Sequence, residues 1–255
     1  QCLNVIKSME KFNAELLKKQ AALASLKYVK NGQSIGLGTG STVKYVLEEL
    51  GERLKNGSFT GIRGIATSGK TEEIARDHGI PLVTFEDVSL LDVYIDGADE
   101  VDDNLDMIKG GGAALIREKI VAQNSKFRVI VVDCTKLSQK IGERWPVPIE
   151  VFPMAIGTEM EFLKSLDAVV QLRLDNEGRV LLTDNGNNIL DANFGELGDP
   201  RRLSMVLDGR AGIAGHGIFH GLADVLVVGS VVGVTEIKKG EKPKFESLRN
   251  ATRLM

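Results

Sequence analysis

Carboxylates, a lysine and a run of glycines follow an apolar stretch near the middle of the chain. Residues 91–95 lead into Asp96-Gly-Ala-Asp-Glu100, and Lys109 is followed by three glycines and then by Glu118. Acidic side chains and an ammonium at the end of a buried strand suit proton transfer on a small polar substrate. Consecutive glycines let the backbone approach a ligand closely. These residues predict an active site; the alternative is an acidic surface turn followed by a glycine-rich loop.

A second glycine-rich segment, Gly36-Leu-Gly-Thr-Gly-Ser-Thr42, carries hydroxyls in place of charges. It stands between an apolar stretch and residues with helical spacing, so backbone N–H groups, hydroxyls and a helix dipole could together bind a phosphate. A dinucleotide fingerprint would need Gly or Ala where Ser41 stands, and a Walker A motif would need a Gly-Lys pair that does not follow here. The segment therefore predicts a phosphate cradle, with a plain tight turn as the alternative.

The elements that must position these two segments alternate between strand and helix. Apolar stretches predict strands at 33–37, 62–66, 82–85, 91–95 and 127–132, and helical spacing predicts helices at 8–30, 43–54, 72–78 and 113–123. Such alternation is typical of a parallel sheet with helical crossovers. Ligands of these sheets bind outside the carboxyl ends of the strands, which is where both glycine-rich segments begin.

The pattern changes at Trp145-Pro-Val-Pro148, because two prolines in three residues are not expected in a central strand or a helix. Short strands with turn residues between them then alternate with two helices, a pattern that indicates a small α+β domain of the split βαβ type. The apolar stretch 223–228 again suits a parallel sheet. We therefore expect an α/β fold in which residues 1–145, continued by 221–255, form a Rossmann-like domain. Residues 146–220 are expected to form an inserted, ferredoxin-like α+β domain.

Composition excludes several classes of function. The formal net charge of −3 gives no basic surface for nucleic acid, and the sequence has no apolar run long enough to span a membrane. Two cysteines, Cys2 and Cys134, make no disulfide framework, which fits a reducing compartment. We expect a cytoplasmic protein, although the start at Gln1 leaves open an organelle location after removal of a targeting segment.

No metal site is expected. The acidic run 102–106 lacks the glycine and the terminal glutamate that an EF-hand has at fixed positions. His78, His216 and His220 are too scattered to form a ligand set, and glycines around His216 and His220 argue against a shared helix face.

Three motifs in order carry a family resemblance. Residues 36–42 (Gly-Leu-Gly-Thr-Gly-Ser-Thr), 96–100 (Asp-Gly-Ala-Asp-Glu) and 109–119 (Lys-Gly-Gly-Gly-Ala-Ala-Leu-Ile-Arg-Glu-Lys) together resemble ribose-5-phosphate isomerase of the A type. The stretch 183–187 (Thr-Asp-Asn-Gly-Asn) with Ile189-Leu-Asp191 is similar to that family as well. The resemblance covers residues 16–235. It implies interconversion of D-ribose 5-phosphate and D-ribulose 5-phosphate in the non-oxidative pentose phosphate pathway, with no nucleotide cofactor and no metal.

The resemblance also implies a role for each matching residue. Glu118 would be the general base that moves a proton between C2 and C1, and Lys109 would stabilise the enediolate oxygen. Asp96 would assist opening of the furanose ring, while Asp99 would bind sugar hydroxyls or share that task. The implied substrate-binding set is Thr39, Gly40, Ser41, Thr42, Asp96, Gly97, Asp99, Lys109, Gly110, Gly111, Gly112, Lys136 and Lys18. As partners, the resemblance implies the sugar phosphate itself and further copies of the chain, in a homodimer or homotetramer.

Two other functions compete with the isomerase. A non-catalytic sugar-phosphate sensor could use the same scaffold, but such a sensor should have lost the base or the lysine, and Lys109 and Glu118 are both present. A nucleotide-dependent dehydrogenase is disfavoured by Ser41. For Glu118 alone, the alternative to a catalytic base is an ordinary glutamate on a helix surface.

Overall fold

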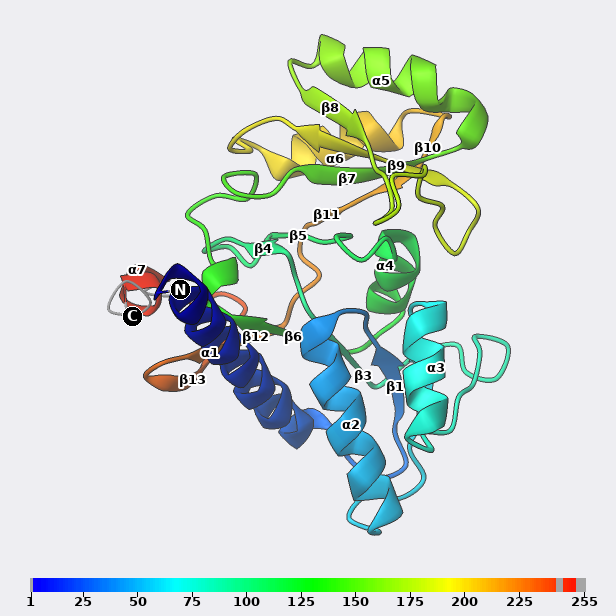
Figure 1. Ribbon diagram of the computed structural model, residues 1–255. Helices are drawn as coiled ribbons and strands as arrows, with labels where there is room; N and C mark the ends of the chain where they lie inside the picture. The colour runs from blue at the N-terminus through cyan, green and yellow to red at the C-terminus, as the bar shows by residue number, and fades with distance from the viewer. Residues whose placement is uncertain (1, 242–244, 251–255) are drawn as a thin grey trace. The chain divides into compact units, whose positions relative to one another are not determined.

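The computed structural model describes the backbone of residues 2–241 and 245–250, and the side chains of residues 14–241 and 245–248 (Figure 1). The described residues group into two compact units. Unit 1 takes them from 1–97, 121–137 and 223–255, and unit 2 takes them from 98–120 and 138–222. Whether 146–220 folds as an inserted domain of its own, with those boundaries, stays a prediction.

Unit 1 is built on a six-stranded sheet with the strand order β13-β12-β6-β3-β1-β2. Its strands are β1 (Ser34–Leu37), β2 (Arg63–Ala66), β3 (Val93–Asp96), β6 (Arg128–Asp133), β12 (Val225–Ser230) and β13 (Gly233–Lys238). Five of them are parallel and only the edge strand β13 runs antiparallel. β2 lies on one side of β1, and β3, the next strand along the chain, lies on the other side of β1. The strand order therefore reverses between β1 and β3, which is a topological switch point. In open α/β sheets the ligand crevice forms at such a point.

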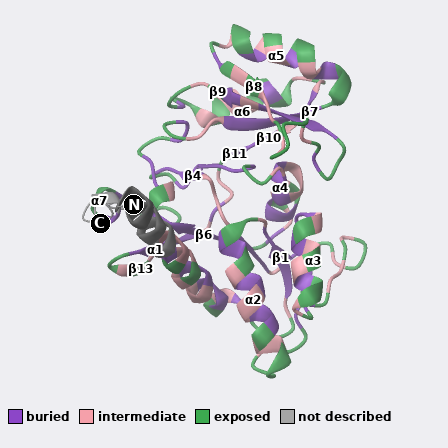
Figure 2. Cartoon of the chain, viewed as in Figure 1, coloured by how far each residue is buried: buried purple, intermediate pink, exposed green. Residues whose placement is uncertain are grey.

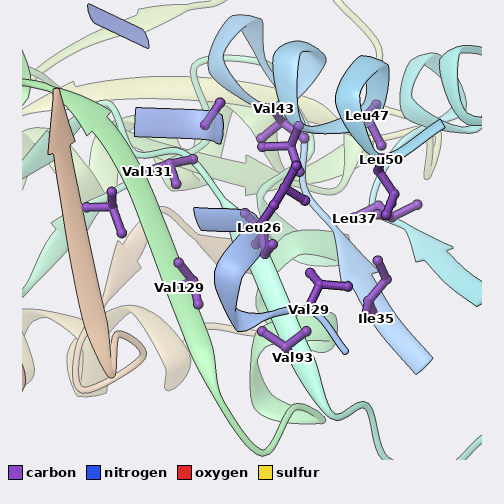
Figure 3. Packing of buried hydrophobic residues seen from close by; sticks show 14 of the residues in the cluster. Leu26, Val29, Ile35, Leu37, Val43, Leu47, Leu50, Val93, Val129 and Val131 are labelled. Atoms are coloured by element: carbon purple, nitrogen blue, oxygen red, sulfur yellow. The ribbon is translucent and has the colours of Figure 1, made fainter. Parts of the chain in front are cut away.

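Helices cover this sheet because their apolar residues recur with helical spacing. The helices that unit 1 contributes are α1 (Cys2–Ser25), η1 (Leu26–Tyr28), α2 (Ser41–Lys55), α3 (Gly69–Asp77), η2 (Cys134–Lys136) and α7 (Phe245–Asn250), together with the end of α4 (Leu115–Gln123). On α2, Val43, Val46, Leu47 and Leu50 are all buried, which places one face of the helix in the core. Figure 3 shows Val43, Leu47 and Leu50 beside residues of the β-strands in one packed cluster. The predicted α/β class is confirmed.

The predicted strand at 82–85 is wrong. Leu82 makes a single bridge to Gly64 of β2, and the chain then turns. The turn is fixed by Asp87, whose carboxylate accepts the backbone N–H of Thr84 at 2.9 Å. A short apolar run beside an edge strand looks like a strand in sequence, but the side-chain hydrogen bond competes successfully with further pairing.

Unit 2 contains two sheets. The larger has the order β10-β7-β9-β8, and the smaller has the order β11-β5-β4. The strands are β4 (Glu100–Val101), β5 (Met107–Ile108), β7 (Val147–Val151), β8 (Val169–Leu172), β9 (Asn188–Asn193), β10 (Ile213–His216) and β11 (Ile218–Phe219), and the helices are η3 (Pro153–Ala155), α5 (Ile156–Ser165), α6 (Pro200–Asp208) and the start of α4. The chain order β7-α5-β8-β9-α6-β10 with this antiparallel sheet is the predicted split βαβ arrangement. Figure 2 shows β7 and most of β9 as buried, in purple, and exposed residues of α5 in green.

Pro148 lies inside β7, which corrects the expectation that no central strand would continue through these prolines. Pro148 faces Asp191 of β9, and on the other side its carbonyl accepts the backbone N–H of Gly217 at 2.7 Å, just beyond the β10 pairing that begins at Ile149. A proline lacks only the N–H donor, so its carbonyl can still take part in pairing here. In the part of the chain that the structure describes, none of the helices combines the length and the apolar character needed to cross a membrane.

Candidate active site

The carboxyl edge of the unit 1 sheet gathers hydroxyl groups around Thr39. This residue follows β1, and its hydroxyl lies 2.8 Å from that of Thr67, 2.9 Å from that of Ser68 and 3.1 Å from that of Thr71. The last three follow β2 or begin α3, so two neighbouring strand ends supply the group. The network holds the Thr39 side chain in one place beside the start of α2.

The loop from Gly38 to Ser41 can approach an anion closely. Gly40 has a φ of 128°, a conformation that residues with a side chain rarely adopt. It caps α2, which begins at Ser41; Ser41 is exposed and Thr42 is buried. The first N–H groups of a helix lack partners within the helix and carry its positive dipole end. The predicted phosphate cradle therefore lies at a helix N-terminus, where backbone N–H groups favour an anion, and its binding of a phosphate stays a prediction.

Asp96 is fully buried at the end of β3 and is held by three donors. Its Oδ1 accepts the backbone N–H of Thr39 at 3.0 Å and that of Gly97 at 2.7 Å. Its Oδ2 accepts a hydrogen bond from the hydroxyl of Tyr94. A β-carbon at position 38 would overlap the Asp96 carboxylate, so Gly38 is needed for this approach. The carboxylate therefore fixes the hydroxyl loop.

The two predicted lysines of unit 1 are half-buried. Lys136 ends η2, directly after β6, so it lies at the same sheet edge as Asp96. Lys18 lies on α1 and donates to Glu15 at 2.7 Å. The Glu15 carboxylate also accepts the hydroxyl of Tyr45 at 2.7 Å, which fixes the position of this ion pair.

Lys109 and Glu118 form a buried ion pair in unit 2. Lys109 follows β5 and Glu118 lies in the first turn of α4. The Lys109 Nζ donates to Glu118 Oε1 at 3.2 Å, and the two residues are 2% and 4% exposed. The Lys109 ammonium also lies over the ring of Phe219, 5.5 Å from its centroid, a cation–π contact. A carboxylate and an ammonium are thus adjacent and shielded from water, where electrostatic interactions are stronger than at the surface.

The glycine loop between these two residues is held by Asp99. Gly110 has a φ of 108°, and the backbone N–H of Gly111 donates to Asp99 Oδ2 at 2.7 Å. A β-carbon at position 111 would lie 2.7 Å from Asp99 Oδ1, so a side chain there would displace the carboxylate. Asp99 is half-buried and Gly112 is exposed.

Two further acidic residues, Glu100 and Asp102, are also buried. Glu100 is buried and accepts the backbone N–H groups of Gly142 at 2.8 Å and Arg144 at 3.1 Å, so it fixes a loop. Burial, together with the negative charges of Asp106 and Asp103, raises the pKa of Asp102 to about 6.

Lys119, next to the predicted base, contacts a buried histidine. Its Nζ donates to the carbonyl of His216 at 2.6 Å and lies 5.0 Å from the centre of the Phe219 ring. Burial lowers the pKa of Lys119 to about 8, against the opposing effect of Asp208. Burial, and then the charge of Lys119, lower the pKa of His216 to about 3, so this imidazole is neutral at pH 7.

The structure thus brings the predicted residues together in three groups: Thr39 with Asp96, Asp99 with Gly111, and Lys109 with Glu118. Sequence reasoning assigned no role to Thr67, Ser68 or Thr71, although hydroxyl residues between a strand and a helix repeat the pattern of residues 36–42. It also missed Tyr94 and Phe219. Phe219 is far from Lys109 in the chain, and no spacing signal connects the two.

Comparison with known proteins identifies relatives over most of the chain. The family model for ribose 5-phosphate isomerase A (phosphoriboisomerase A) matches residues 63–233. Ribose-5-phosphate isomerase A of Desulfatibacillum aliphaticivorans is 46% identical over 224 residues, which are 88% of this chain and 97% of the relative.

Solved structures give the same result. A D-ribose-5-phosphate isomerase in complex with phospho-erythronic acid is 40% identical with a TM-score of 0.87, and the match covers 89% of this chain and 99% of that one. Ribose 5-phosphate isomerase from Plasmodium falciparum is 38% identical with a TM-score of 0.85, covering 89% of this chain and all of that one.

Proposed function

Because the chain belongs to the ribose 5-phosphate isomerase A family, we propose that it interconverts D-ribose 5-phosphate and D-ribulose 5-phosphate through an enediolate, without a nucleotide or a metal ion. The observation that supports this most directly is the buried contact of 3.2 Å between Lys109 Nζ and Glu118 Oε1. Aldose–ketose isomerisation needs a base that moves one proton and a positive charge near the oxygen that becomes negative. This pair supplies both groups.

Glu118 removes the proton from C2 of the open-chain aldose. The electron pair moves into the bond between C1 and C2, and negative charge develops on the C1 oxygen, where Lys109 stabilises it. Transfer of a proton from the C2 oxygen to the C1 oxygen, and return of the first proton from Glu118 to C1, give the ketose. Proton transfer by a positioned carboxylate contributes a factor of about 10²–10⁴ to the rate, and removal of one oxyanion donor typically costs about 10²–10³.

The other predicted residues bind and prepare the sugar. Opening of the furanose ring is assigned to Asp96, with Asp99 binding the sugar hydroxyls or sharing that task. Thr39, Ser41 and Thr42, with the intervening amides, hold the phosphate or the polar end of the sugar, and Lys136 and Lys18 lie near the substrate.

The test is a coupled assay with ribose 5-phosphate in the presence of a chelator and without added nucleotide. Formation of ribulose 5-phosphate under these conditions is the expected result. A requirement for a metal ion or a nucleotide, or no turnover by the folded protein, would contradict the proposal. Phospho-erythronic acid, which occupies the similar solved isomerase, is expected to compete with the substrate.

Neither of the other functions is favoured by the described residues, since the pair that a sensor should have lost is intact. We also propose that the chain assembles into a homodimer or homotetramer, as the resemblance implies, and that it works in the cytoplasm, as its cysteine content led us to expect. Light scattering on the purified protein tests the first of these, and fractionation of the source cells tests the second.

A further inference from the structure

Arg173 connects the glycine loop to the antiparallel sheet of unit 2. It follows β8, and its Nη1 donates to the carbonyl of Gly110 at 2.7 Å and to that of Gly111 at 3.3 Å. Its Nε donates to Asp191 Oδ2 at 2.8 Å, and its Nη2 donates to Asp191 Oδ1 in a short hydrogen bond. We propose that Arg173, aligned by Asp191, is a positioning residue that sets the Gly110–Gly112 backbone for substrate binding.

The peptide unit between Gly110 and Gly111 is held from both edges. In a trans peptide the carbonyl oxygen and the N–H point in opposite directions, and the described chain has no cis peptide bonds. The Gly110 carbonyl accepts from Arg173 on one edge, and the Gly111 N–H donates to Asp99 on the other. Two opposed hydrogen bonds therefore fix the rotation of this unit.

The next peptide unit, between Gly111 and Gly112, is also held by Arg173. Because the Gly111 carbonyl points to Arg173, the N–H of Gly112 points away from the guanidinium. An N–H group directed in this way can donate to an oxygen of a bound sugar. Glycine has the widest choice of backbone conformations. The Ala113 N–H closes the turn by donating to the Gly110 carbonyl at 3.0 Å, and the contacts with Arg173 and Asp99 add to this bond in holding one conformation.

The Asp191 carboxylate holds the guanidinium of Arg173 in one orientation. It lies on β9, where it faces Pro148 of β7 on one side and Gln171 of β8 on the other, so its backbone is part of the sheet. The carboxylate takes two nitrogens of the planar guanidinium and leaves Nη1 for the loop. A lysine has no such planar fork and could not make this set of bonds. The motif Ile189-Leu-Asp191, which the isomerase chemistry leaves without a role, thereby acquires one.

The experiment compares Arg173→Ala with Arg179→Ala. Arg179 lies in the same part of the chain and pairs with Asp175 at 2.9 Å, but its side chain is 69% exposed, so it serves as the matched control. We expect Arg173→Ala to lower kcat/KM for ribose 5-phosphate and the affinity for phospho-erythronic acid by about tenfold to a hundredfold, the effect of a misplaced binding group. Arg179→Ala should match the wild type in both. The pH profile of kcat should keep its shape in Arg173→Ala, because Lys109 and Glu118 are untouched.

Chemical rescue separates positioning from a general loss of structure. Guanidinium at a concentration far below denaturation should restore activity and inhibitor affinity to Arg173→Ala, whereas ammonium at the same ionic strength should not. Arg173→Lys should remain well below the wild type. Activity and affinity within twofold of the wild type in Arg173→Ala would overturn the proposal, and so would a loss that guanidinium does not restore.

This inference rests on the proposed function for its substrate, and the two can fail separately. Turnover by the wild type together with normal behaviour of Arg173→Ala overturns only the positioning role. A wild type that binds phospho-erythronic acid without isomerising ribose 5-phosphate overturns the proposed function. In that case inhibitor affinity alone decides the role of Arg173. A wild type that does neither overturns both.

Discussion

Glu118→Gln changes the proposed base with the least change of shape. The amide oxygen of glutamine can still accept from Lys109, which lies 3.2 Å from the carboxylate, but an amide cannot take up the C2 proton. We expect kcat to fall by about 10²–10⁴, which corresponds to about 3–5 kcal/mol in the activation barrier. The affinity for phospho-erythronic acid should change far less, since the phosphate loop and the glycine loop are unaltered.

The same substitution has a cost in stability that must be measured alongside. Lys109 is 2% exposed, so the substitution removes the carboxylate charge that pairs with a buried ammonium. Breaking a buried ion pair in this way costs up to about 3–5 kcal/mol of folding free energy. Thermal unfolding should therefore show a lower Tm for Glu118→Gln. The double variant with Lys109→Met should recover much of the loss, because it removes both charges.

Stopped-flow or coupled assays at temperatures below the Tm of every variant separate the loss of kcat from the loss of stability. Glu72→Gln is the matched control, because Glu72 also lies in the first turn of a helix and pairs with a basic residue, at 3.1 Å from Arg76 on an exposed face. It should leave kcat unchanged. A folded Glu118→Gln protein with a kcat within a few-fold of the wild type would refute Glu118 as the base. Loss of inhibitor binding in parallel with kcat would point instead to a collapsed site.

Three further predictions follow from the site and its surroundings. Lys109→Met should lower kcat by about 10²–10³, measured in the same coupled assay, and a normal rate would exclude it as the enediolate cation. Asp96→Asn should slow the reaction of the closed sugar more than that of the open-chain form, and equal slowing in stopped-flow assays would contradict a role in ring opening. Asp102→Asn should stabilise the protein at pH 7 by about 1–3 kcal/mol, the size of a raised pKa near 6. Because its pKa is raised, Asp102 holds a proton in the folded state between about pH 4 and 6, where it is already ionised in the unfolded state. The free energy of unfolding of the wild type therefore falls as the pH rises from about 4 to 6, while that of Asp102→Asn does not. Urea unfolding should therefore show the gain at pH 7 shrinking toward pH 4, and a constant gain would contradict the assignment.

The strand ends could be predicted from sequence because local signals repeat there. Gly38–Thr42 follows a short apolar strand and precedes a helix, and the stretch after Asp96 follows another such strand. Parallel strands place such ends on one edge. The contact between Lys109 and Glu118 follows from a helix that starts soon after a glycine loop. The run at 82–85 has the same apolar character as a strand, but Asp87 turns it away, and that hydrogen bond is not visible as periodicity.

Contacts between distant parts of the chain could not be predicted. Phe219 reaches Lys109 because β11 pairs antiparallel with β5, a register that no local pattern sets. Arg173 reaches Asp191 because β8 and β9 are neighbours in the larger sheet, and no local pattern in the sequence connects Arg173 with Gly110. Likewise, the sequence does not show that Asp102 is buried, and this burial raises its pKa.

The buried pair in unit 2 is costly, and the fold lowers that cost where it can. Taking two charges out of water costs several kcal/mol per ion, which their mutual attraction does not always repay. Glu118 lies in the first turn of α4, where the helix dipole favours a negative charge. Lys109 lies over the Phe219 ring, and its backbone N–H is bonded to the carbonyl of Gly217 at 2.9 Å. A pair of apolar residues would serve stability as well or better. A paired base and cation make physical sense here if a proton is moved between two carbons beside them, which is the chemistry proposed for this site.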